Sequence, residues 1–244
     1  MSVAAAHGIQ TAARVRVVSV VAMDPTLRLL ETRVGRPQPL GDRDTASAIA
    51  KTPVGAAPIA LDRINLAGDD QADRTVHGGP DKAVYSYPAE HAVDWQADGF
   101  AIAPGGVGEN LVTEGARETD VRIGDVFAWG DARLQVSQPR APCFKLSLHT
   151  GRKDVGPRMI TTGRSGWYFR VLTPATVDPH GELDLVARDP AAPTVFECFA
   201  VMFPGFRAEA DDPALVARVL GTATLSDEWL GSVLHRNPHA HAPH

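Results

Sequence analysis

Residues 126–137 read Val-Phe-Ala-Trp-Gly-Asp-Ala-Arg-Leu-Gln-Val-Ser. Gly130-Asp131 separates two apolar runs, which predicts two antiparallel strands, at 126–129 and 133–137, joined by a tight hairpin turn. Working outward, similar short runs bounded by glycine and proline predict further strands at residues 14–22, 57–64, 83–87, 109–112, 167–172 and 182–187. Because few long helical patterns lie between them, we expect a mainly β protein with a barrel or closed sheet.

Helical spacing is confined to a few segments. Residues 88–97 predict one helix among the strands, with Pro88 in its first turn, and residues 23–52 read as loop. Beyond a proline-containing linker, residues 212–220 and 226–234 predict helices capped by Asp211 or Asp212 and by Ser226. We therefore expect a β domain at 14–188, a small helical module at 192–236, and mobile termini at 1–13 and 237–244.

Composition narrows the class of protein. The chain has 244 residues, 44% of them hydrophobic and 22% charged, and a formal net charge of −5. These values are those of an ordinary globular protein, and they predict neither a membrane span nor a nucleic-acid polymer as partner. His7, Gln10 and Arg14 interrupt the N-terminal alanines, so we expect no secretion signal and a cytoplasmic location.

The two cysteines, Cys143 and Cys198, limit the chemistry. They cannot form a disulfide framework or supply the four thiolates of an iron–sulfur cluster or a structural zinc site. Cys198 lies among apolar residues without a nearby cation, which predicts an inert core position. Redox chemistry on this chain would therefore need electrons from a partner.

Cys143 has a different setting, between Arg140 and Lys145 and directly after Pro142. A strand is predicted to stop at Pro139 and a short helix to start at Pro142, which places Cys143 at the positive end of that helix. A helix N-terminus and two cations stabilise a thiolate, the form that attacks electrophiles or binds a soft metal. The alternative interpretation is a small buried residue.

A glycine-containing loop, His77-Gly78-Gly79-Pro80-Asp81-Lys82, precedes the strand predicted at 83–87. Adjacent glycines let backbone amides face an anion, and Lys82 adds a charge, so the loop could hold a phosphate. A simple glycine turn before a strand explains the same residues. Neither a Walker loop nor a Gly-x-Gly-x-x-Gly motif is present.

Three other polar groups are candidates. Residues 68–73 form an acidic turn, interpreted as solvated rather than cation-binding because the EF-hand glycine and glutamate are missing. Glu109 and Asn110 follow another glycine-rich loop and either face a pocket or stabilise the turn. Arg170 shares a strand face with Tyr168, opposite Trp167 and Phe169, and is predicted to point at the same anion as Arg140.

Two hydrolase mechanisms find little support. A cysteine hydrolase would need His77, His91 or His149 beside Cys143, but no local nucleophile signature is present. A zinc hydrolase would need three or four converging ligands, and the core region has no helical His-x-x-x-His pair.

Six short motifs occur in order along the chain. They are Ile49-Ala-Lys-Thr-Pro-Val54, Gly68-Asp69 with Gln71-Ala-Asp73, His77 with Gly79 and Asp81-Lys-Ala83, Gly108-Glu-Asn-Leu111, Gln138-Pro-Arg140 with Pro142-Cys143, and Ser165-Gly-Trp-Tyr168 with Arg170-Val171. Together they resemble the MOSC domain, named for the C-terminal domain of molybdenum cofactor sulfurase. The likeness runs over about residues 14–188 and is greatest to the stand-alone bacterial branch associated with resistance to 6-N-hydroxylaminopurine. The terminal piece, with Leu225-Ser-Asp-Glu-Trp229, resembles the three-helix module that often follows the domain in that branch.

The resemblance implies a β-barrel that holds a molybdenum cofactor (molybdopterin), independent of pyridoxal phosphate, with Cys143 as the ligand of molybdenum. It also implies reduction of N-hydroxylated compounds such as N-hydroxylated purine bases. Candidates for holding the phosphate or the pterin are Lys51, His77, Gly78, Gly79, Asp81, Lys82, Asn110, Arg140 and Arg170. His77 or Glu109 is the predicted proton donor, alongside Cys143 in the catalytic set.

The expected partners follow from what the chain lacks. The sequence contains no ferredoxin-like or flavin-binding segment, so a separate electron-donor redox protein is implied beside a small N-hydroxylated substrate. The sequence leaves a homodimer open. The alternative function is a non-catalytic carrier of molybdenum cofactor or sulfur, in which Cys143 holds a persulfide.

Overall fold

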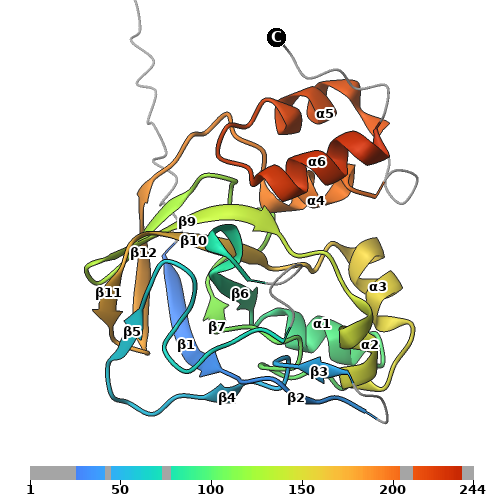
Figure 1. Ribbon diagram of the computed structural model, residues 1–244. Coiled ribbons are helices and arrows are strands. Elements are labelled where there is room, and N and C mark those ends of the chain that lie inside the picture. The colour runs from blue at the N-terminus through green and yellow to red at the C-terminus, as the bar shows by residue number, and fades with distance from the viewer. Residues whose placement is uncertain (1–25, 42–44, 73–77, 204–210, 238–244) are drawn as a thin grey trace, which may run out of the picture.

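A closed β-barrel forms the body of the protein (Figure 1). The computed structural model describes residues 26–41, 45–72, 78–203 and 211–237. The barrel strands are β1 (Leu27–Val34), β6 (Val84–Pro88), β7 (Leu111–Glu114), β8 (Val126–Trp129), β9 (Ala132–Pro139), β10 (Trp167–Thr173) and β12 (Gly181–Ala187). They pair in the order β12-β8-β9-β10-β6-β7-β1, and β1 closes the ring onto β12. All these pairs are antiparallel except β6 with β7.

The β8–β9 hairpin confirms the turn expected at Gly130-Asp131. Trp129 pairs with Ala132 across the turn, and Gly130 has a φ of 56°, in the left-handed region that favours glycine. The predicted alternation in β10 is confirmed too, because Trp167 and Phe169 are fully buried in the barrel core and Tyr168 is not part of that cluster. The local sequence patterns thus predicted strands β8, β9 and β10 correctly.

The N-terminal strand was predicted in the wrong place. Residues 14–22 lie outside the described residues, and β1 falls within the segment 23–52 that was interpreted as loop. Its register shifts between Leu29 and Glu31, so the buried residues Leu27, Leu29 and Thr32 do not keep a period of two. The predicted strand 57–64 shrinks to β5 (Ile59–Leu61), which pairs with β11 (Ala175–Val177) outside the barrel.

Short pieces complete the sheet region. β4 (Thr52–Pro53) pairs antiparallel with the end of β1, and β2 (Gln38–Pro39) pairs with β3 (Ala46–Ser47). A 3₁₀ turn, η1 (Pro80–Lys82), leads from the glycine loop into β6.

Three helices lie beside the barrel. α1 (His91–Ala97) starts later than predicted because Pro88 is the last residue of β6 rather than a first helical residue. α2 (Phe144–Thr150) confirms the short helix after Pro142, with Cys143 as its N-cap. α3 (Val155–Thr162), which was not predicted, packs against α2.

A group of helices covers one end of the barrel, next to β9 and β10 (Figure 1). α4 (Val195–Val201), α5 (Pro213–Leu220) and α6 (Asp227–Arg236) form it. The predicted caps Asp212 and Ser226 are present, whereas α4 was not detected by residue spacing because most of its residues are apolar. Cys198 is fully buried in α4, as predicted. Within the described residues, no helix is long and apolar enough to cross a bilayer.

Polar contacts fasten this helical group to the barrel. The backbone N–H of Ser226 donates to the carbonyl of Ser137 (3.1 Å), and its hydroxyl donates to Gln138 Oε1 (2.5 Å). The α6 N-terminus is therefore fixed to Ser137 and Gln138 near the end of β9, three and two residues before Arg140.

Candidate functional site

A pocket with a cavity volume of about 100 Å³, open to solvent, lies beside Cys143. We call it the cysteine pocket. Its polar and reactive lining residues are Ser47, Lys51, Asp69, Asp70, Gln71, Lys82, Tyr85, Asn110, Arg140, Cys143, Lys145 and Tyr168. Five of the predicted site residues, Lys51, Lys82, Asn110, Arg140 and Cys143, are thus brought together, along with the backbone of Gly78.

Cys143 is a free, partly exposed thiol on the pocket wall. It is the N-cap of α2, with extended backbone angles (φ −118°, ψ 166°), and its carbonyl accepts the N–H of Leu146 at 3.0 Å. The alternative interpretation as a sealed core residue is excluded by this exposure.

Arg140 supplies a buried positive charge next to that thiol. Its side chain is only 7% exposed, and the guanidinium lies over the ring of Tyr85 at 5.1 Å. Its Nη1 has no hydrogen-bond partner among the described residues. Burial opposes the charge, but nearby Tyr85, Tyr168 and Cys143 outweigh it and raise the pKa of Arg140 above its usual value. A permanent cation with an unused donor is a feature of an anion-binding site.

Two tyrosines, Tyr85 and Tyr168, lie next to Arg140. Tyr85 and Tyr168 lie on neighbouring strands with ring centroids 5.1 Å apart, and the Tyr85 hydroxyl donates to the carbonyl of Ser165 at 2.8 Å. Burial raises the pKa of both phenols, so both stay protonated at neutral pH. Sequence reasoning did not select either residue, although both occur within its strands.

Asp69 links two predicted site residues at the opposite wall. Its carboxylate forms an ion pair with Lys51 and accepts the Asn110 side-chain amide at 3.0 Å and the N–H of Gly35 at 2.8 Å. Burial lowers the pKa of Lys51, and the Asp69 carboxylate opposes that shift. The prediction of a solvated turn at 68–73 is wrong for Asp69, which is 6% exposed because these donors replace water.

The glycine loop reaches the pocket only in part. Gly78 lines it with a φ of 79°, and a Cβ at this position would lie 2.4 Å from Gln71 Oε1, so only glycine fits without displacing that side chain. Lys82 lines it too, and its Nζ contacts Glu228 Oε2 of α6 at 2.6 Å. Gly79 does not line the pocket, and His77 lies outside the described residues.

Arg170 and Asp81 do not reach the cysteine pocket, and the prediction that Arg170 points at the same anion as Arg140 is wrong. Arg170 Nε bonds to Asp81 Oδ1 at 2.7 Å, and its Nη1 donates to Gln135 Oε1 (3.1 Å) and to the Thr224 carbonyl (3.0 Å). Alternation does place Arg170 on the face of Tyr168, but two residues along a strand are about 6.6 Å apart. That distance brings Arg170 to Asp81 and the helical group instead.

Glu109 also turns away from the pocket. Its buried carboxylate accepts the backbone N–H groups of Gly105 and, at 3.1 Å, of Val107. Burial raises the pKa of Glu109, while these backbone donors oppose the shift. The structure therefore gives Glu109 a role in bracing the 105–109 loop, and the prediction that it faces the pocket as a proton donor is wrong.

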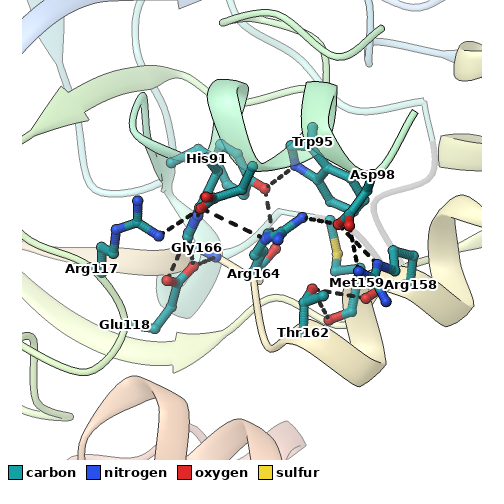
Figure 2. A network of polar contacts seen from close by, with 12 residues as sticks. His91, Trp95, Asp98, Arg117, Glu118, Arg158, Met159, Thr162, Arg164 and Gly166 are labelled. Atoms are coloured by element: carbon teal, nitrogen blue, oxygen red, sulfur yellow. Dashed lines mark hydrogen bonds and ion pairs between the residues drawn. The ribbon is translucent and has the colours of Figure 1, made fainter. Parts of the chain in front are cut away.

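A polar network joins α1, α3 and the segment that leads into β10 (Figure 2). Glu118 accepts from His91 Nε2 at 2.8 Å and from the N–H of Gly166 at 2.6 Å, and Arg164 Nη1 bonds to Asp98 at 2.6 Å. Hydrogen bonds from Arg158 and Arg164 lower the pKa of Asp98 to about 2. The network fixes the 164–166 turn, whose Ser165 carbonyl holds the Tyr85 hydroxyl.

Replacing Glu118 with alanine should therefore destabilise the protein. The change leaves the Gly166 N–H and the buried His91 Nε2 without their acceptor, and each buried polar group left unsatisfied costs about 1–3 kcal/mol. Urea unfolding followed by circular dichroism measures the loss. As a matched control, Glu114→Ala removes the solvent-exposed partner of Arg28 and should cost less than about 1 kcal/mol. Equal effects of the two substitutions would contradict a structural role for Glu118.

The described residues contain no group of three or more histidine, cysteine or acidic side chains that could hold a metal ion. The surrounding groups fit a metal–organic cofactor, because the Cys143 thiol is partly exposed and Arg140 Nη1 has no hydrogen-bond partner among the described residues.

Fold and site together define a β-barrel protein that presents one cysteine in a cationic small-ligand pocket. The sequence profile of the MOSC domain matches residues 73–183. Over 196 residues the chain is 41% identical to protein YiiM of Escherichia coli (strain K12), covering 78% of this chain and 84% of that protein. The chain belongs to the MOSC domain family, which is associated with the molybdenum cofactor.

Two further comparisons bear on fold and activity. The crystal structure of YiiM from Geobacillus stearothermophilus superposes with a TM-score of 0.70 at 33% identity, over 86% of this chain and 98% of that chain. The chain is also 35% identical over 167 residues to a protein named reductase in Gibberella moniliformis (strain M3125 / FGSC 7600). That match covers 66% of this chain but 29% of the fungal protein, so most of the latter lies outside the comparison.

Proposed function

We propose that this protein is a molybdenum-cofactor-dependent reductase of N-hydroxylated compounds, with Cys143 as the protein ligand of molybdenum. The observation that carries the proposal is the partly exposed thiol of Cys143 in one pocket with Arg140, whose Nη1 has no hydrogen-bond partner among the described residues. The reaction is R–NHOH + 2 e⁻ + 2 H⁺ → R–NH₂ + H₂O, in which the N–O bond breaks and the oxygen leaves as water. The electrons come from a separate donor protein, and the setting is the cytoplasm.

The lining residues can be assigned to parts of the cofactor. Cys143 offers the soft ligand, and Arg140, Lys82 and Lys145 offer positive charge for its phosphate, beside the backbone of Gly78. When bound, the cofactor supplies the two-electron redox centre. Lys51 and Asn110, held by Asp69, offer polar contacts at the opposite wall for the pterin edge.

The side chains of the protein bind and orient the cofactor and the substrate. Arg140 balances negative charge in a buried setting, where its field is screened less than in water. Tyr85 and Tyr168 remain protonated because burial raises their pKa values. The Tyr85 ring contacts the Arg140 guanidinium and so helps to position it. With Glu109 turned into its loop, His77 remains the proposed proton donor, since imidazole titrates near neutrality.

Element-resolved mass spectrometry of freshly purified protein, followed by reduction of 6-N-hydroxylaminopurine with a chemical electron donor, tests this function. The expected result is about one molybdenum per chain and formation of adenine. The alternative of a sulfur carrier gives a different result, a persulfide on Cys143 with neither molybdenum nor turnover. That result would remove the reductase proposal.

A further inference from the structure

A second hollow, with a cavity volume of about 310 Å³, lies between the barrel and the C-terminal helices. We call it the helix-side hollow, and its lining includes Met202, Phe203, Glu228, Trp229, Ser232 and Arg236 from the helical region and Gln138 and Pro142 from the barrel. Lys82, Arg140, Cys143 and Tyr168 line both this hollow and the cysteine pocket. The two spaces therefore meet at the thiol.

We infer that the helix-side hollow is the subsite for the planar heteroaromatic ring of the substrate. This inference rests on the proposed function, because it places the ring on one side of Cys143 and leaves the cysteine pocket for the cofactor. Phe203 and Trp229 line only the helix-side hollow, whereas Lys51, Asp69 and Asn110 line only the cysteine pocket. The helical group would then form half of the substrate site rather than an accessory.

The walls of the hollow suit a flat, weakly polar ring. Tyr168, Phe203 and Trp229 contribute aromatic surface, and Phe203 and Trp229 are only 8% and 3% exposed. Enzymes that act on a base hold it between aromatic or apolar side chains and hydrogen-bond to its edge. Offset or edge-on contacts between aromatic rings add about 0.5–1.5 kcal/mol beyond the area buried.

Polar groups stand where a ring edge would need donors and acceptors. Glu228, Ser232 and Arg236 recur every four residues on α6, so they share the helix face that lines the hollow, and Gln138 faces them from β9. Arg236 lies over the ring of Phe203 at 5.3 Å. These mixed donors and acceptors are the groups that read the edges of heteroaromatic bases.

The hollow is held in shape by contacts already formed. The Lys82–Glu228 contact and the Ser226 bonds to Ser137 and Gln138 join its two sides. Because the walls belong to elements fixed to one another, little ordering is needed when a ring binds, and preorganisation of this kind favours affinity.

Filling the hollow tests the inference. Ser232→Phe adds bulk to the lining, and His235→Phe places the same side chain on an exposed position of α6 that does not line the hollow. Adenine is the probe, since it has the substrate's ring but no N–O bond, and isothermal titration calorimetry on the full chain measures its binding. We expect Ser232→Phe to weaken adenine binding at least tenfold and to raise KM for 6-N-hydroxylaminopurine with little change in kcat. Molybdenum content should not change, and His235→Phe should match the wild type.

The outcomes separate this inference from the proposed function. If Ser232→Phe binds adenine as tightly as the wild type, or if the wild type binds none, the subsite is overturned even where turnover and molybdenum are present. If adenine binding falls in Ser232→Phe but the wild type neither holds molybdenum nor reduces the substrate, the subsite stands and the reductase fails. If thermal unfolding shows that Ser232→Phe does not fold, Ser232→Leu, which adds a smaller apolar side chain, is used in its place.

Discussion

Replacing Cys143 with serine should abolish reduction of N-hydroxylated substrates and remove molybdenum from the purified protein, while the fold stays intact. A serine hydroxyl does not ionise near neutrality and is a poor ligand for a soft, sulfur-rich metal centre. Serine is, however, a favoured N-cap residue, and Cys143 is the N-cap of α2. Stability should therefore be equal or higher by up to about 1 kcal/mol.

Steady-state turnover with a chemical donor, molybdenum per chain and thermal unfolding together check this prediction. Cys198→Ala serves as the matched control, because Cys198 is fully buried in α4 and does not line either space. The control should lose some stability through the cavity it leaves, but keep molybdenum and turnover. A Cys143→Ser protein that still reduces the substrate would end the proposed mechanism.

Arg140→Met should weaken cofactor retention by about 10- to 150-fold. A hydrogen bond to a charged group contributes about 1.5–3 kcal/mol, and Arg140 Nη1 has no described protein partner that would compete for it. Methionine has a similar length and suits a buried site, and no carboxylate among the described residues forms a salt bridge with Arg140, so the change leaves no counter-charge of an ion pair behind. Equilibrium dialysis of molybdenum from the purified variants measures retention.

Arg170→Met makes the same substitution on the adjacent strand β10, away from the pocket. It removes the ion pair with Asp81 and the hydrogen bond to the Thr224 carbonyl, so it should lower stability. Cofactor retention should stay near that of the wild type. Equal molybdenum loss from both variants, or none from Arg140→Met, would contradict the assignment of Arg140 as the anion-binding group.

Local pattern was enough to predict the parts of the fold whose signals are short-range. The Gly130 hairpin, the alternation of β10 and the short helix after Pro142 all follow from neighbours within a few residues. The setting of Cys143 between two cations was visible in the same way. β1 was missed because its bulge breaks the period of two, and α4 was missed because most of its residues are apolar. α3 was missed because Gly156 and Pro157 in its first turn are residues typical of turns.

The errors in the site arise from contacts between distant segments. Asp69 is buried by Lys51, Asn110 and Gly35, and Arg170 is drawn aside by Asp81 and Thr224. A single sequence shows charge and alternation, but it does not show which distant partner satisfies a given carboxylate or guanidinium. For the same reason the helix-side hollow, built from β9 and α6, had no signal in the linear sequence.

The pairing of β1 with β12 has a consequence for how the chain is made. Leu27 meets Leu183, so the ring cannot close on the ribosome until nearly the whole barrel has been synthesised. Until then β1 has an open edge on one side, and bringing such distant strands together slows folding. Nascent chains halted before β12 emerges would carry unpaired amides and carbonyls that invite association with other chains.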